Sequence, residues 1–249
     1  MFVNYNLQII FSARMRILPE KEKTMDEKSR SMTEGNFEFF DDETFGNPTY
    51  NAEKVYISRS ARMTGRVILE DEVVIWPHSS LRADEGSPFK IGRGTNIQDS
   101  VIMHGLYDAF VYDEAGEPYS ILIGNHCTIA HRATIHGPTR IGKHTFVGFH
   151  AIIHNSVIGR DCYIGLGAIV NGVQIRDHAY VPDGWVVNNS HTADTLPSVP
   201  DHLREFNRRV VDHNKHLLKQ YHERRNQLQK LSKGGKNVVF NHHSLNSAP

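Results

Sequence analysis

Three histidines near the middle of the chain have the residue type and spacing of a metal site. His104 ends the run NIQDSVIMH, and His131 and His136 lie five residues apart in the run AHRATIH. Neutral imidazoles suit zinc, and a catalytic zinc commonly combines three protein ligands with an open position where bound water becomes nucleophilic. Three unrelated surface residues remain the alternative in a chain with 16 histidines, because this spacing alone does not bring the side chains to one point.

A six-residue period sets the frame that must position these histidines. Aliphatic residues recur at every sixth position from about Val55 to Val187, with an unbroken series at Ile123, Ile129, Ile135, Ile141, Val147 and Ile153 and one-residue slips before Ile158 and Ile175. Neither an amphipathic helix nor an alternating strand has this period. It predicts a triangular prism with three short strands per coil and one inward aliphatic residue per side.

The period also relates the histidines to one another. His104 follows the inward Met103 and His136 follows the inward Ile135, so both should point outward at matching positions on one side of the prism. His131 comes two places after the inward Ile129 and should project from a different point. Glycines that follow the aliphatic residue are expected at corners, where a positive φ or a close backbone approach is needed.

The remaining segments lie outside this repeat. Residues 105–120 are polar and acidic with Gly and Pro, which predicts a loop extruded from the prism. Beyond Pro200 the period becomes 3.6 and predicts a helix of roughly 25 residues, with Asp201 as N-cap; its apolar stripe is Leu203, Phe206, Val210, Leu217, Leu218 and Tyr221. The predicted organisation is an N-terminal extension over 1–50, largely disordered, a β-helix over 51–198, a helix over 199–231 and a flexible tail over 232–249.

The composition excludes several classes of protein. Lys and Arg number 28 and so do Asp and Glu, so no net charge favours nucleic acid or a membrane surface. No apolar run approaches the ~20 residues of a membrane span. Cys127 and Cys162 form neither a disulfide framework nor a cysteine zinc site, and small buried side chains are expected there.

Four short runs together resemble the γ-class carbonic anhydrases, including carboxysome-associated members. They are RADEG at 82–86, NIQD at 96–99, His104-Gly105, and AHRATIHGP at 130–138. The resemblance covers roughly residues 52–221 and implies a mainly β fold, a left-handed parallel β-helix of hexapeptide repeats with a C-terminal α-helix. It also implies a homotrimer with metal sites at subunit interfaces. His104 and His136 would come from one subunit and His131 from its neighbour, holding zinc or, alternatively, iron(II) or cobalt.

The resemblance further implies roles for polar residues around the metal. Gln98 matches a residue that orients the metal-bound hydroxide, Asn214 matches one proposed to hold carbon dioxide or bicarbonate, and Glu85 is a candidate for proton transfer. Interface salt bridges and hydrogen bonds at the pocket edge are implied for Arg82, Asp84, Asn96 and Asp99.

Two positions depart from the family pattern. Tyr107 stands where the family archetype has an acidic proton shuttle, and Asp212 replaces a tyrosine that lines the archetype's pocket. An exposed carboxylate of suitable pKa could replace the shuttle; the candidates are Asp108, Asp113, Glu114 and Glu117.

We therefore predict a zinc-dependent lyase that hydrates carbon dioxide to bicarbonate. A non-catalytic, metal-stabilised assembly subunit and a hexapeptide acyltransferase are the alternatives. No nucleic-acid or membrane partner is expected. The predicted location is cytoplasmic, because the N-terminus lacks the basic region and cleavage site of a signal peptide; secretion and association with a microcompartment stay open.

Overall fold

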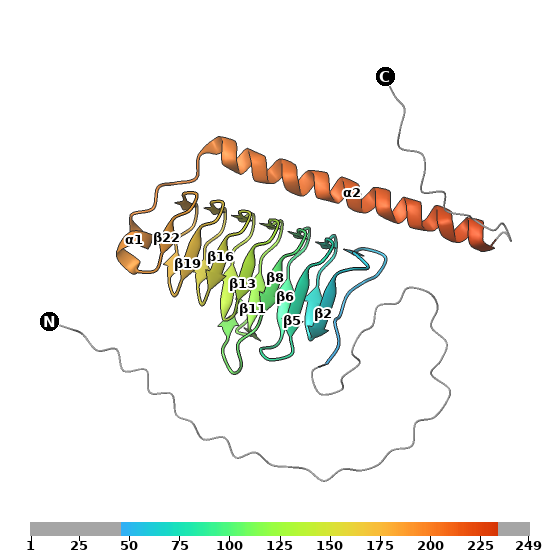
Figure 1. Cartoon of the computed structure of the whole chain (residues 1–249), viewed down its shortest axis with the longest axis horizontal. Coiled ribbons are helices and arrows are strands. Elements are labelled where there is room, and N and C mark those ends of the chain that lie inside the picture. Colours follow the sequence, from blue (N-terminus) through green and yellow to red (C-terminus); the bar gives the residue numbers. More distant parts are fainter. Residues whose placement is uncertain (1–45, 234–249) are drawn as a thin grey trace, which may run out of the picture. The chain divides into compact units, whose positions relative to one another are not determined.

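The described part of the chain is a β-solenoid followed by a long helix. The computed structural model describes residues 46–233 (Figure 1). The predicted N-terminal extension, as far as residue 45, and the predicted tail beyond residue 233 lie outside the described residues. Nearly all strands pair in parallel with the equivalent strand of the next coil, so the predicted parallel β-helix with a C-terminal helix is confirmed.

Three parallel sheets form the sides of the solenoid. The β1–β21 sheet has the order β1 (Tyr56–Ile57), β4 (Val74–Ile75), β7 (Asn96–Ile97), β12 (Thr128–Ile129), β15 (Phe146–Val147), β18 (Tyr163–Ile164) and β21 (Tyr180–Val181). The β3–β20 sheet contains β3 (Val67–Leu69), β6 (Phe89–Ile91), β11 (Ile121–Ile123), β14 (Thr139–Ile141), β17 (Val157–Ile158) and β20 (Gln174–Ile175). The β2–β22 sheet contains β2 (Arg62–Gly65), β5 (Ser80–Ala83), β8 (Ile102–His104), β13 (Thr134–His136), β16 (Ile152–His154), β19 (Ile169–Asn171) and β22 (Val186–Val187).

The core is a set of aliphatic columns that run along the solenoid axis. Ile91, Ile123, Ile141, Ile158 and Ile175 are consecutive partners in the β3–β20 sheet, and all are buried. Every aliphatic residue of the predicted period belongs to the same buried cluster. The one-residue slips are shorter corners: Ile123 pairs with Ile141, 18 residues on, whereas Ile141 pairs with Ile158, 17 residues on.

Glycines and histidines have different tasks at the corners. The glycines after the aliphatic residues serve close approach, since a Cβ on Gly142 would lie 2.5 Å from the backbone nitrogen of Arg160. Their φ angles are not positive, so close backbone approach is the reason for glycine at these positions. Positive φ instead occurs at the second corner residue, a conformation for which His is enriched among non-glycine residues. Five histidines adopt it: His78, His126, His144, His150 and His178.

The segment between β8 and β11 leaves the solenoid, as predicted. It carries an antiparallel hairpin of β9 (Val111–Tyr112) and β10 (Pro118–Tyr119), with Tyr119 opposite Val111. Ile91 and Ile123 nevertheless remain in register on either side of it. The insertion therefore leaves the coils undisturbed.

The short helix α1 (Ser190–Asp194) closes the last coil, and α2 (Asp201–Lys233) then runs back along the solenoid (Figure 1). It contacts β1, β4 and β12 of the β1–β21 sheet. Near its start Leu203 packs against the buried cluster of Ala130, Phe146, Tyr163 and Val199. Towards its end Arg225 donates to the carbonyl oxygen of Ala52, before the first coil. No helix within residues 46–233 is long and apolar enough to cross a membrane.

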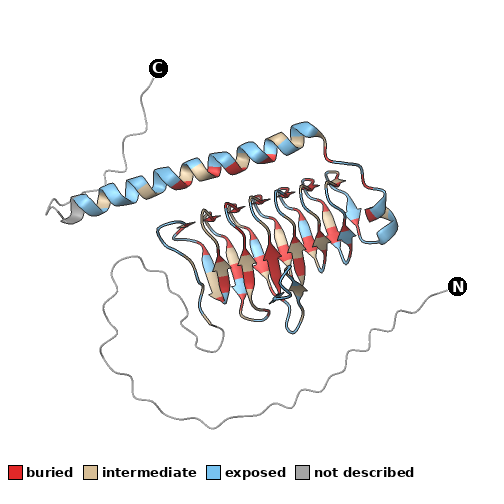
Figure 2. Ribbon diagram, turned by 180° about the vertical axis from the view of Figure 1, so that it is seen from behind, coloured by how far each residue is buried: buried red, intermediate tan, exposed pale blue. Residues whose placement is uncertain are grey.

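Two details of α2 differ from the expectation. It has 33 residues rather than roughly 25, because strong helix formers continue it beyond the apolar stripe, and Asp201 is its first residue rather than its N-cap. Figure 2 shows a few buried positions along α2 among mostly exposed ones. The buried residues are Asn207, Val211, Asn214 and Leu218, whereas Phe206 is 38% exposed. The buried asparagines became apparent only with the solenoid beneath them.

Candidate metal centre

His104 and His136 lie next to each other on the outer surface of the β2–β22 sheet. β8 and β13 pair with His136 opposite His104, and His104 Nδ1 lies 3.3 Å from His136 Nε2. Two nitrogens that each lie about 2.05 Å from one tetrahedral zinc are about 3.3 Å apart. The pair therefore has the spacing of two ligands of one metal ion.

The neighbours of this pair are those expected for two metal ligands. His136 Nδ1 lies 2.8 Å from the carbonyl oxygen of Gly137 and donates to it, which leaves the lone pair of His136 Nε2 for a metal ion. Coordination through His104 Nδ1 would place the ring proton of His104 on Nε2. That nitrogen lies 3.1 Å from Glu85 Oε2. A carboxylate beside the second ring nitrogen is the usual outer partner of a metal-ligating histidine, so these residues fit a bound metal ion.

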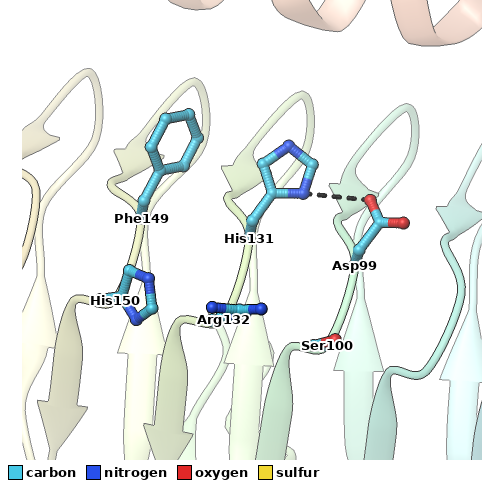
Figure 3. A pocket seen from close by; sticks show the side chains of 6 residues that line it. All are labelled: Asp99, Ser100, His131, Arg132, Phe149 and His150. Atoms are coloured by element: carbon cyan, nitrogen blue, oxygen red, sulfur yellow. Dashed lines mark ion pairs between the residues drawn. The ribbon is translucent and has the colours of Figure 1, made fainter.

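His131 does not join that pair. It lies at the corner between β12 and β13, beside Arg132 with its φ of 60°, and its Nδ1 is 3.0 Å from Asp99 Oδ2 (Figure 3). The corner pocket is lined by Asp99, Ser100, His131, Arg132, Phe149 and His150 (Figure 3). Within residues 46–233 no three His, Cys, Asp or Glu side chains are grouped to hold a metal. One chain thus brings two predicted ligands together and leaves the third apart.

Asn96 lies in β7 and Gln98 directly follows it, one coil before Thr128 and Ala130. Asn96 is buried and its Nδ2 donates to Thr128 Oγ1, while its Oδ1 accepts from Gln98 Nε2 at 3.1 Å. These bonds fix the orientation of the Gln98 amide. Gln98 is 8% exposed and its Oε1 has no partner among the described residues. Gln98 Oε1 is therefore a buried hydrogen-bond acceptor of fixed orientation near the corner of His131.

Asn214 lies on the buried face of α2, where both atoms of its amide are engaged. Its Oδ1 accepts from Trp76 Nε1 at 2.7 Å, and its Nδ2 donates to the carbonyl oxygen of Val210 at 2.8 Å. Trp76 follows β4 and precedes Gln98 by one coil, since Ile75 pairs with Ile97. Asn214 is therefore tied to the same sheet as Gln98.

Arg82, Asp84 and Glu85 lie in and after β5, one coil before His104. Arg82 is the register partner of His104, and its Nη2 donates to Asp84 Oδ2 at 2.9 Å. Burial would raise the pKa of Asp84, but the hydrogen bonds from Arg82 and from the backbone outweigh burial and lower that pKa. Asp84 thus stays ionised beside Arg82, and Asp84 Oδ1 has no partner among the described residues.

The extruded loop holds the residues considered for proton transfer. Tyr107 is highly exposed. Asp113 Oδ1 accepts from the backbone nitrogens of Glu117 and Ala115, and the bond from Glu117 is the main cause of a lowered pKa. A shuttle needs a pKa near the working pH, so Asp113 is unsuited to that role.

Two neighbours of the site were not singled out from the sequence. His154 continues the column, with its ring centroid 5.2 Å from that of His136, and its Nδ1 lies 2.7 Å from Asn171 Oδ1. The six-residue period could have identified His154, because it follows the inward Ile153 as His136 follows the inward Ile135. Trp76 had no such signal, because its bond to Asn214 depends on where α2 docks.

Comparison with known proteins gives three kinds of match. Residues 156–188 match the family model "Hexapeptide repeat of succinyl-transferase". The fold resembles a hexapeptide transferase family protein from Anaplasma phagocytophilum, with a TM-score of 0.56 and 22% identity over 70% of this chain and 92% of that one. This likeness concerns the fold alone.

Two curated relatives have a higher sequence identity to this chain. The carboxysome assembly protein CcmM of Nostoc sp. is 36% identical over 68% of this chain, which spans 30% of that protein's length. The carbonic anhydrase of Methanosarcina thermophila is 35% identical over 68% of this chain and 72% of its own length. With this similarity and a hexapeptide-repeat solenoid, the chain belongs to the γ-class carbonic anhydrase family.

Proposed function

We propose that the chain catalyses the reversible hydration of carbon dioxide to bicarbonate, at metal sites shared between the subunits of a homotrimer. The observation that carries the proposal is the His104–His136 pair, with 3.3 Å between His104 Nδ1 and His136 Nε2 and the Glu85 carboxylate 3.1 Å from His104 Nε2. Zinc fits this donor set, and three imidazoles would also accept iron(II) or cobalt.

A shared site follows from where the third histidine lies. His131 Nδ1 is engaged by Asp99, which leaves Nε2 as the ligand atom for a metal held by His104 and His136 of another subunit. Exposed apolar residues lie beside the pair on the same sheet, with Ile102 51% and Ile152 40% exposed. Such a surface supports burial against another copy of the chain.

The polar residues around the site have separable tasks in this reaction. A bound metal supplies a Lewis acid that makes water nucleophilic near neutral pH. Gln98 Oε1 accepts a hydrogen bond from the attacking water and so orients it toward carbon dioxide, while Asn96 holds the Gln98 amide. The second N–H of Asn214 is the donor that we assign to the substrate.

The proton released by the reaction needs an acceptor at the rim. Glu85 is half exposed and its Oε2 lies 3.1 Å from His104 Nε2, so its carboxylate reaches both the centre and solvent. We assign proton transfer to Glu85. The Arg82–Asp84 pair, with the unpartnered Asp84 Oδ1, is assigned to the subunit interface.

The test is stopped-flow hydration of carbon dioxide by anaerobically purified protein whose metal has been counted. We expect about one metal per chain and rapid hydration, both lost in His131→Ala. His150→Asn is the control, because His150 lines the same pocket and Asn tolerates its positive φ. Protein with one metal per chain that leaves the hydration rate unchanged contradicts the catalytic proposal.

A second candidate function comes from the relatives named carboxysome assembly proteins. A metal-stabilised trimer could act as an assembly subunit in such a compartment, and the location would then be carboxysomal. In that case His131→Ala loosens the trimer without any hydration activity to lose. Hydration of carbon dioxide by the metal-loaded wild-type chain separates the two functions, and analytical ultracentrifugation of His131→Ala tests the assembly role.

A further inference from the structure

A second pocket lies between α2 and the corner that joins the β3–β20 sheet to the β1–β21 sheet. We call it the helix groove. Three corner residues and six helix residues line it, and none of them is a predicted metal ligand. Those that matter below are Asn207, Arg204, Arg208, Lys215, Asp161 and Asp212.

Asn207 presents an unsatisfied acceptor in this groove. It is 5% exposed, and its Nδ2 donates to the carbonyl oxygen of His144 at 2.9 Å. That bond fixes which end of the amide is which, because only the nitrogen can donate to a carbonyl. Oδ1 is buried and has no hydrogen-bond partner among the described residues. A buried acceptor of this kind requires a donor.

The charges of the groove favour an anion. Three cationic side chains face two carboxylates, and the cations are held by exposed ion pairs, such as Arg208 with Glu205 and Lys215 with Glu72. Exposed pairs of this kind contribute little and are readily exchanged for a ligand. Burial is the main cause of the lowered pKa of His126 at this corner, and the nearby Lys215 lowers it further.

We propose that the helix groove binds a small oxyanion that carries its own hydrogen-bond donor, of the hydrogencarbonate or hydrogenphosphate kind. The O–H of the anion donates to Asn207 Oδ1, and its other oxygens accept from Arg204, Arg208 and Lys215. An anion without a proton would place its lone pairs against the Asn207 oxygen. This site is independent of the proposed metal centre.

Calorimetric titration of inorganic phosphate into the metal-loaded full chain at pH 7 tests the site. We expect a binding event that weakens at least threefold in Arg208→Gln and at least tenfold in Asn207→Asp, where a carboxylate replaces the amide. Arg209→Gln is the matched control, since Arg209 is exposed, follows Arg208 in the helix and does not line the groove. Equal phosphate affinity in the Arg208→Gln and Arg209→Gln variants overturns the proposal, and Arg208→Gln serves if Asn207→Asp fails to fold.

Two further titrations test the chemistry of the ligand. Sulfate has the shape of phosphate but no proton at pH 7, so we expect it to bind at least tenfold more weakly than phosphate. Sulfate that binds as tightly as phosphate overturns the role of Asn207. Hydrogencarbonate is then titrated against bound phosphate. If hydrogencarbonate displaces phosphate at a concentration below that of the phosphate, the groove is assigned to hydrogencarbonate. If the phosphate signal survives, the groove is assigned to hydrogenphosphate.

Discussion

Asp99 holds His131 at the corner of the solenoid, with Oδ2 of the carboxylate 3.0 Å from Nδ1 of the ring. A carboxylate on one ring nitrogen of a metal-ligating histidine selects the tautomer and increases the basicity of the other nitrogen. Within one subunit this contact has no metal to serve. It is explained if the free nitrogen of His131 reaches a metal held by another subunit.

Asp99→Ala should therefore weaken metal binding about 10- to 100-fold, the usual effect of removing such a partner. Asp99→Asn should weaken it less, because the amide oxygen can still accept from Nδ1. Competition with a chromogenic chelator measures both. Asp194→Ala, at an exposed carboxylate on α1, is the control and should leave metal affinity unchanged. Wild-type affinity in Asp99→Ala would contradict the positioning role.

A shared site also predicts complementation between two inactive variants. In a mixed trimer of His104→Ala and His131→Ala chains, one of the three interfaces has all its ligands intact. Random mixing of equal amounts should then restore about a quarter of the wild-type metal content and hydration activity. Purification through a different tag on each variant keeps only the mixed trimers, in which this fraction should rise to about a third. If all three ligands belonged to one chain, every mixture would remain inactive.

The prism itself was predictable from the sequence because its packing is determined by local repeats. Each inward residue, such as Ile135, is specified by its own hexad and stacks only on its neighbours in the adjacent coils. The matching positions of His104 and His136 follow from the same period. That His131 projects from a different point was predicted in the same way.

What could not be predicted depends on non-local docking. Asn207 and Asn214 are buried because α2 lies on the β1–β21 sheet, whereas a 3.6-residue pattern placed Phe206 on the inner face. The helix groove likewise exists only once α2 and a corner meet. The contact between Asp99 and His131 needed the coil length, which places residues 32 positions apart side by side.

Stability should fall below neutral pH through a histidine at the helix groove. Burial, Lys215 and His144 lower the pKa of His126 in the folded chain, so the unfolded chain binds more protons once the pH falls below the ordinary histidine pKa of about 6.5. The contribution of His126 to the free energy of unfolding is therefore present above that pKa. It is lost as the pH falls toward the lower pKa of His126 in the folded chain. Urea unfolding at pH 7.5 and 5.5 should show this loss, and His126→Asn should reduce it. His202→Asn, at an exposed histidine early in α2, should not.

Core and surface isoleucines should respond differently to truncation. Ile164→Ala removes a fully buried side chain and should cost about 2–5 kcal/mol in the free energy of unfolding. Ile152→Ala, on the outer surface of the β2–β22 sheet, should cost under about 1 kcal/mol in the isolated subunit but shift the trimer toward monomer. Chemical denaturation and sedimentation measure the two effects. Equal loss of subunit stability in both variants would contradict the assignment of Ile152 to an interface.

The return path of α2 changes how the whole solenoid should melt. A stack of coils in which each touches only its neighbours can fray from either end, one repeat at a time. Here one helix joins the last coils, through Leu203, to the residues before the first, through Arg225. Loss of a terminal coil therefore also releases the helix that covers the others. Because α2 couples the first coils to the last, the solenoid should unfold in one all-or-none transition.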